Sequence, residues 1–142
     1  MVASALPLAL VLAAVVALAA TGNLLSASPL VIAAQVAAVM LNLWARSSFE
    51  KGTFRVEAAP GGTSLIRRGP YRVLRHPMYS AALMFVWASV LGHISAFTVG
   101  LGVAVTALTM VRVGAEERLL QAQYPDYGEY MRTTKALVPF LY

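Results

Sequence analysis

Four long apolar segments constrain the fold of this chain more than any other feature. They run from Ala5 to Ala20, from Pro29 to about Ala45, from Met78 to Leu91 and from Ser95 to Val111. Hydrophobic residues make up 59% of the 142 residues, which leaves too little polar surface for a soluble globule of this size. We therefore expect an all-α integral membrane protein with about four transmembrane helices.

We expect one domain over residues 1–142. Residues 1–45 would supply the first two helices, and residues 46–142 a basic loop, a helical hairpin and a C-terminal tail. A cleaved signal peptide is the alternative for the first segment, because Ala17-Leu18-Ala19 is similar to a cleavage site. No Lys or Arg precedes that apolar run, which favours a membrane helix.

Basic residues are concentrated in the loop that separates the second and third apolar segments. Within or beside this loop are Arg46, Lys51, Arg55, Arg67, Arg68, Arg72 and Arg75, against only Glu50 and Glu57. The positive-inside rule then places the loop and both termini in the cytoplasm, most simply in a cell inner membrane. The net charge of +5 is typical of contact with anionic headgroups in such a protein, and we expect no nucleic-acid partner.

Few residues in the chain can bind a metal ion. The sequence contains no cysteine and two histidines, His76 and His93. Disulfides and thiolate chemistry are thereby excluded, and we expect no metal site. His93 lies in the tight reversal between the third and fourth segments, where we expect a structural role.

Two smaller features leave alternatives open. Gln35 and Asn42 are seven residues apart and lie on one helical face, where packing against a neighbouring helix is favoured over lining a polar cavity. In the basic loop, residues 54–56 and 64–66 are short extended pieces on either side of a turn, and they could pair with each other or lie along the lipid headgroups.

Two polar islands border the last two apolar segments. The basic island is Gly69 to Tyr79, with the sequence GPYRVLRHPMY, and the acidic island is Glu116-Glu117-Arg118. Pro77 is suited to the first position of a helix. The tail that contains the acidic island starts as a helix near Ala115 and is interrupted at Pro125. Because the third and fourth segments form a helical hairpin, its topology brings the two islands together at the cytoplasmic side.

Together the islands offer groups for a ligand that carries both charges. Arginine can pair with a carboxylate, and glutamate with an amine or cation. Tyr71 and Tyr79 could stack on a flat ring or face a cation. Taken singly, each of these residues is more commonly an interfacial anchor, but their combination with prolines at fixed offsets favours a binding site.

The chain resembles the isoprenylcysteine carboxyl methyltransferase and phospholipid N-methyltransferase superfamily of membrane enzymes. The resemblance extends from about Trp44 to the C-terminus. It consists of Thr63-Ser64-Leu65-Ile66, Gly69-Pro70-Tyr71, Arg75-His76-Pro77-Met78-Tyr79, Glu116-Glu117 with Leu120, Tyr127, Tyr130 and Val138-Pro139.

This resemblance implies S-adenosylmethionine as the methyl donor and a lipophilic acceptor, which could be an isoprenylcysteine-like carboxylate, a lipid amine or a small thiol. It implies a cofactor site of backbone groups at Thr63, Ser64, Leu65 and Ile66 and of Tyr71, His76, Pro77, Met78 and Tyr79. Glu116 and Glu117 would pair with the cofactor's amino group or support those residues, and Arg75 would pair with its carboxylate. His76 and Arg75 are the candidate catalytic residues, and His76 would act as the base that takes a proton near neutral pH.

Two other functions remain possible on this sequence. Membrane sterol reductases carry a similar Arg-His-x-x-Tyr region and use NADPH, and a non-catalytic membrane module could retain the site as structure. Cofactor binding separates the three hypotheses. The oligomeric state is left open.

Overall fold

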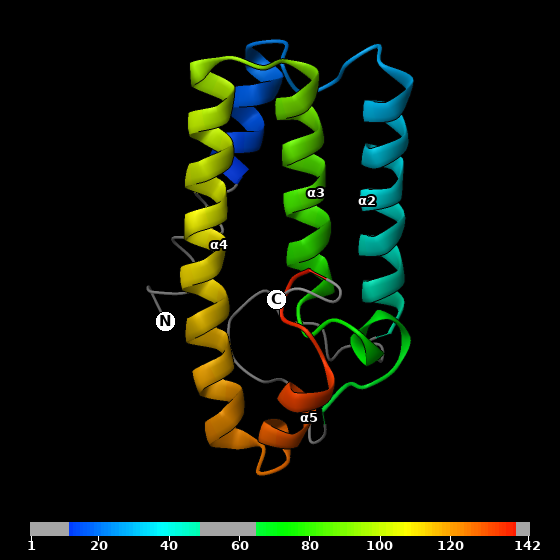
Figure 1. The fold of residues 1–142 in the computed structure, drawn as a ribbon, viewed down its shortest axis with the longest axis vertical. Helices are drawn as coiled ribbons and strands as arrows, with labels where there is room; N and C mark the ends of the chain where they lie inside the picture. Colours follow the sequence, from blue (N-terminus) through cyan, green and yellow to red (C-terminus); the bar gives the residue numbers. More distant parts are fainter. Residues whose placement is uncertain (1–11, 49–64, 139–142) are drawn as a thin grey trace.

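The computed structural model describes residues 12–48 and 65–138, which form a bundle of helices lying side by side (Figure 1). Residues 12–20 are helical and are called the N-terminal helix. The other elements are α2 (Pro29–Ser47), the 3-10 helix η1 (Gly69–Arg72), α3 (Pro77–Gly92), α4 (Ala96–Gln123) and α5 (Tyr127–Thr133). Within the described ranges the only β-type pairing is one isolated bridge, between Leu74 and Lys135. The all-α prediction is thereby confirmed for these residues.

Helix ends follow local sequence signals. Pro29 opens α2 and Pro77 opens α3, because proline lacks the amide hydrogen that a first helical residue would leave unpaired. Ser95 caps α4 by accepting a hydrogen bond from the Thr98 amide, and the Thr98 hydroxyl accepts one from the Ser95 amide in return. The interruption predicted at Pro125 is confirmed, since α4 ends at Gln123.

The last apolar segment and the helical start of the tail form one continuous helix. Our prediction treated Ser95 to Val111 and the helix from Ala115 as separate parts, whereas α4 runs through both. Gly114 does not interrupt it, because an interior glycine costs a helix only about 1 kcal/mol relative to alanine. Glu116 and Glu117 are therefore carried on a rigid element rather than on a loop.

The helices pack around a core at the middle and upper part of the bundle. This core unites Ala14 and Leu18 of the N-terminal helix, Val86 and Val90 of α3, and Val105 of α4. Burial of such apolar side chains makes the main favourable contribution to the free energy of folding, and it requires close packing of the interior. The core fixes α3 and α4 as neighbours.

A buried polar contact joins α2 to α3. The Gln35 side-chain amide donates to the Leu24 carbonyl at 2.7 Å and to the Ser89 hydroxyl at 3.1 Å. Ser89 itself donates to the Leu24 carbonyl at 2.8 Å. The favoured packing role of Gln35 is confirmed.

In the part of the chain that the structure describes, two helices, α2 and α4, are long and apolar enough to cross a membrane. The protein buries only 22% of the apolar window of α2 and 33% of that of α4, whereas a core helix of a soluble protein is mostly buried. Large side chains on α2 lie more than half exposed, among them Leu30, Val36, Met40 and Trp44. These observations indicate a membrane protein. The count of four spans stays a prediction, since α3 has only 16 residues.

The two ends of the bundle differ in chemistry. At the upper end in Figure 1, His93 closes α3 and its Nε2 atom lies 2.8 Å from the Leu25 carbonyl oxygen. The opposite end carries η1, α5 and the basic and acidic islands, and we call it the site end. His93 therefore has the structural position that the sequence predicts. The cytoplasmic location of the site end stays a prediction, and the predicted pairing of residues 54–56 with 64–66 lies outside the described residues.

Replacing Gly69 with alanine should destabilise the site end. Gly69 has a φ of +59°, and an added Cβ would overlap the Ser48 hydroxyl and lie 3.3 Å from Trp44 Nε1. We expect a loss of about 1–3 kcal/mol in the free energy of unfolding, measured by denaturation in detergent. Gly100→Ala is the control, because no atom lies within 4 Å of its added Cβ. Equal stability of the two variants would contradict the packing described at Gly69.

Candidate functional site

The backbone of the basic island is held by the C-terminal tail. After η1, the Arg75 amide donates to the Lys135 carbonyl at 2.7 Å and the His76 amide donates to the Ala136 carbonyl at 3.0 Å. In return, the Lys135 amide donates to the Val73 carbonyl at 2.9 Å. His76 is thus fixed between this pairing and the first turn of α3.

The two islands meet, as the hairpin topology predicts. His76 is buried, with its Nε2 atom 3.3 Å from Glu117 Oε1 and its Nδ1 atom 3.9 Å from Glu116 Oε2. Its ring stacks on that of Tyr79, with centroids 5.7 Å apart and planes 25° from parallel. One imidazole therefore lies between two carboxylates and against a tyrosine from the next helical turn.

Tyr79 and Glu116 form a second chain of contacts with Arg112. The Tyr79 hydroxyl donates to Glu116 Oε2 at 2.8 Å and accepts a hydrogen bond from Arg112 Nε. The Arg112 guanidinium also lies 5.7 Å from the centre of the Tyr79 ring, a cation–π distance. Only 7% of Arg112 is exposed, so this arginine belongs to the site.

Arg112 is not among the site residues predicted from the sequence. The signal that could have found it is its spacing from Glu116. Residues four apart on a helix lie on one face and can pair, and α4 continues unbroken through both.

Arg75 is surrounded by partners within the protein. Its Nε atom donates to Glu117 Oε1 at 2.7 Å. One terminal nitrogen donates to the Met131 and Thr134 carbonyls at 3.2 Å and 2.6 Å. The side chain is 10% exposed. Arg75 therefore ties Glu117 to the end of α5, and its pairing with a ligand carboxylate stays a prediction.

Three further tyrosines, Tyr71, Tyr127 and Tyr130, lie at the site end. The Tyr130 hydroxyl donates to the Tyr71 carbonyl at 2.6 Å. Burial, together with the nearby charge of Glu116, raises the pKa of Tyr71 above its ordinary value. Burial raises the pKa of Tyr130 to about 12, although the charges of Arg75 and Arg67 act to lower it. Both phenols are thus neutral hydrogen-bond donors at physiological pH.

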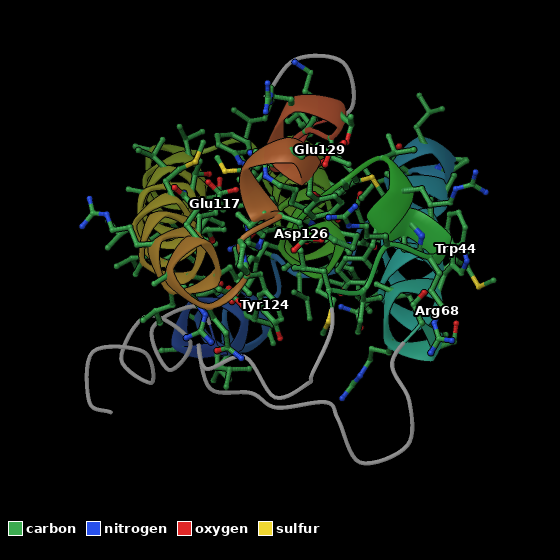
Figure 2. The ribbon with its side chains drawn as sticks, turned by 90° about the horizontal axis from the view of Figure 1, so that it is seen from below. Trp44, Arg68, Glu117, Tyr124, Asp126 and Glu129 are labelled. Carbon is green, nitrogen blue, oxygen red and sulfur yellow. The ribbon has the colours of Figure 1, made fainter. Side chains whose placement is uncertain are left out.

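The third tyrosine, Tyr127, is 1% exposed and packs edge-on against Tyr130, with ring centroids 5.8 Å apart. Its hydroxyl has no hydrogen-bond partner among the described residues. Figure 2 looks at this end of the molecule and shows α5 lying between α4, which carries Glu117, and α2, which carries Trp44.

Four of the remaining predicted site residues are among the described residues. Pro77 is buried and Met78 half-buried in the first turn of α3. Leu65 and Ile66 are half-buried in the segment that leads to η1. Thr63 and Ser64 lie outside the described residues.

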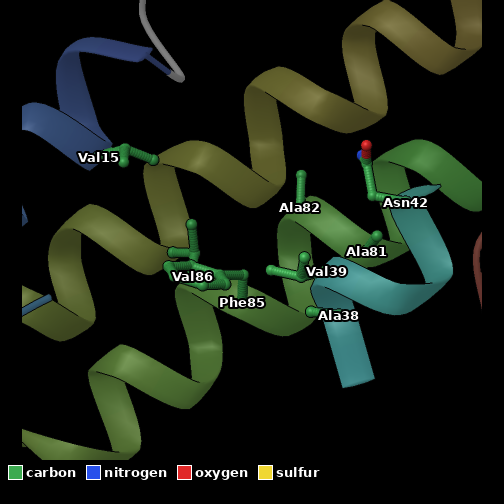
Figure 3. Close-up of a pocket in the computed structure, with 8 residues that line it drawn as sticks. All are labelled: Val15, Ala38, Val39, Asn42, Ala81, Ala82, Phe85 and Val86. Carbon is green, nitrogen blue, oxygen red and sulfur yellow. The ribbon is translucent and has the colours of Figure 1, made fainter. Parts of the chain in front are cut away.

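An apolar cleft of about 220 Å³ lies between the N-terminal helix, α2 and α3 (Figure 3). Small side chains shape its walls, and Asn42 is the one polar lining residue among those that the structure describes. The lining is formed by Val15, Ala38, Val39, Asn42, Ala81, Ala82, Phe85 and Val86. Ala81 and Ala82 follow Tyr79 within one helical turn, so the cleft adjoins the polar cluster along α3.

Fold and site define the class as a helical membrane protein with a polar site at one end of its bundle. Residues 32–127 match the family model for phospholipid methyltransferases. Since the match covers more than half of the chain, the chain belongs to the phospholipid methyltransferase family. Membership in this family, together with the two apolar helices, indicates a membrane methyltransferase.

One curated relative extends this comparison. Over 81 residues the chain is 32% identical to the cobalt-zinc-cadmium resistance protein CzcN of Cupriavidus metallidurans. The aligned part covers 55% of this chain and 37% of that protein, so the chain spans well under half of its relative. No solved structure is significantly similar to the chain.

Loss of Arg75 should destabilise the protein far more than loss of Arg67. Arg75 and Glu117 are 10% and 15% exposed, whereas Arg67 pairs with Asp126 at 42% and 56% exposure. Removing one partner of a buried pair costs about 3–5 kcal/mol, but an exposed pair contributes about 1 kcal/mol or less. Chemical denaturation of Arg75→Ala and Arg67→Ala would measure the difference. Equal losses would show that Arg75 does not hold the site together.

Proposed function

We propose that the protein is an S-adenosylmethionine-dependent methyltransferase that methylates a lipophilic acceptor at the cytoplasmic face of the membrane. The observation that carries the proposal is the convergence of His76, Tyr79, Glu116 and Glu117 at one end of the bundle, in a chain of the phospholipid methyltransferase family.

The residues at the site end fit the chemistry of this cofactor. Its amino-acid part carries an ammonium and a carboxylate, and the site offers Glu116 and Glu117 for the first and arginine for the second. Arg75 is the predicted partner of the carboxylate, and Arg112 is the alternative that the structure adds because of its contact with Tyr79. Tyr71 and Tyr79 offer aromatic faces for the purine ring.

Several other residues complete the proposed cofactor site. Pro77 and Met78 would form part of its wall at the start of α3, and Thr63, Ser64, Leu65 and Ile66 would contribute backbone groups. When bound, S-adenosylmethionine supplies an electrophilic methyl group on a sulfonium.

The protein's own task in such a reaction is alignment, exclusion of water and proton transfer. Methyl transfer needs the acceptor atom in line with the methyl group, so no nucleophilic side chain is required. An amine or thiol acceptor must lose a proton, and in this proposal His76 takes it at a ring nitrogen. Glu116 and Glu117 orient that ring from two sides, at 3.9 Å and 3.3 Å from its nitrogens.

The apolar cleft supports a lipophilic acceptor. Among the described residues its lining is apolar apart from Asn42, so a hydrocarbon chain would gain free energy by lying in it. The small side chains of Ala38, Ala81 and Ala82 leave the space that such a chain needs. An acceptor held there would place its polar end toward Tyr79 and His76.

Purified protein in detergent should bind S-adenosylhomocysteine saturably, as measured by calorimetry with NADPH titrated in parallel. His76→Ala and Glu117→Gln should each weaken binding by about tenfold, the cost of one or two hydrogen bonds to a charged group. His93→Ala is the control, since His93 lies at the opposite end. Binding of NADPH alone would favour the reductase, and binding of neither by folded protein would favour a non-catalytic module.

Filling the apolar cleft should weaken methylation of a long-chain acceptor and leave cofactor binding unchanged. With Ala82→Phe we expect kcat/KM for a long-chain acceptor to fall by about tenfold or more, while affinity for S-adenosylhomocysteine stays within about twofold of wild type, a change below about 0.5 kcal/mol. Leu91→Phe is the matched control, because Leu91 on the same helix is 66% exposed. Equal activity of the two variants would exclude the cleft as the acceptor's position.

A further inference from the structure

We infer that the Tyr127 hydroxyl is a ligand-binding group, which contacts the amino-acid end of S-adenosylmethionine; this inference rests on the proposed function. Neither the family match nor the motif residues assign a role to this hydroxyl. Its assignment comes from the position and surroundings of the side chain in this structure.

The first observation is that the hydroxyl is buried without a partner. Tyr127 is 1% exposed, and its hydroxyl oxygen has no hydrogen-bond partner in the described part of the chain. Leaving a buried hydroxyl unpaired costs about 1–3 kcal/mol. Phenylalanine would fill the same space without that cost, so packing alone does not explain a tyrosine here.

The neighbouring tyrosine shows what a structural phenol does in this protein. The Tyr130 hydroxyl donates to the Tyr71 carbonyl at 2.6 Å, which ties α5 to η1. The ring of Tyr127 packs edge-on against that of Tyr130. Of these two neighbouring buried tyrosines, only Tyr130 has a hydrogen-bond partner for its hydroxyl among the described residues.

The second observation concerns the charges beside Tyr127. Burial raises the pKa of this phenol most, and the negative charge of Glu117 raises it further, while the positive charge of Arg75 lowers it. Arg75, which pairs with Glu117, donates to the Met131 carbonyl one helical turn after Tyr127 on α5. The pair therefore lies against the helix that carries Tyr127, and this phenol is neutral at physiological pH. A neutral hydroxyl can donate one hydrogen bond and accept another.

These surroundings select the part of the ligand that the hydroxyl would meet. Glu117 and Arg75 are the groups that the proposed function assigns to the ammonium and the carboxylate of the cofactor. A hydroxyl beside them can donate to the carboxylate or accept from the ammonium. The adenosine part would lie farther away, toward the aromatic faces of Tyr71 and Tyr79.

Two ligands and one matched variant test this inference. S-adenosylhomocysteine contains the amino-acid end, and 5′-methylthioadenosine lacks it. In Tyr127→Phe, calorimetry should show about tenfold weaker binding of S-adenosylhomocysteine, whereas affinity for methylthioadenosine, measured directly or by competition, should be unchanged. The ligand-free Tyr127→Phe protein should melt at or above the wild-type temperature, because the unpaired hydroxyl is gone.

Tyr130→Phe is the control for folding, and it should lower the melting temperature because the Tyr71 carbonyl loses its donor. Unchanged affinity for S-adenosylhomocysteine in Tyr127→Phe would overturn the inference. That result is expected if the hydroxyl bonds only to water. Equal losses for the two ligands would overturn it too, by placing the contact on the nucleoside. If the wild-type protein binds no S-adenosylhomocysteine, the proposed function itself fails.

Discussion

The contact between the two polar islands is the interaction on which the site end depends. Charged groups beside a bilayer are costly unless they are paired. Here the pairing crosses the α3–α4 hairpin, with Arg75 and His76 against Glu117 and with Tyr79 against Glu116. Each island therefore supplies the partners for the charged groups of the other. Removing either island would leave the charged groups of the other unpaired, at a cost in free energy.

This pairing explains why the tail folds back over the bundle. Arg75 donates to the Met131 and Thr134 carbonyls as well as to Glu117. The same stretch of tail accepts the amide hydrogens of Arg75 and His76 through Lys135 and Ala136. Leu137 then packs against Val113 of α4 in a small core. The tail thus covers the network from below and keeps water from its buried members.

Local signals in the sequence predict the helices well, and topology predicts the meeting of the islands. Proline and serine mark the ends of α2, α3 and α4, and the short reversal at His93 forces α3 and α4 to be neighbours. The sequence could not predict that Arg112 points at Tyr79 or that the tail pairs with residues 73–76. Those contacts depend on the direction of side chains and on pairing between residues about 60 positions apart. The periodicity of apolar residues in the sequence gives information on neither.

The position of the site at one end of the bundle, rather than in its middle, suits the two reactants of the proposed reaction, which come from different solvents. The proposed cofactor, whose amino-acid part is zwitterionic, would arrive from water, where its charges are hydrated, and the proposed lipophilic acceptor would arrive from the bilayer. Only the boundary between them lets each reactant keep most of its favourable surroundings. Along α3 the change from polar to apolar surroundings lies between Tyr79, which bonds to Glu116, and Ala82, which lines the apolar cleft. One helical turn therefore separates the polar cluster from the residues that would bind the proposed lipophilic acceptor.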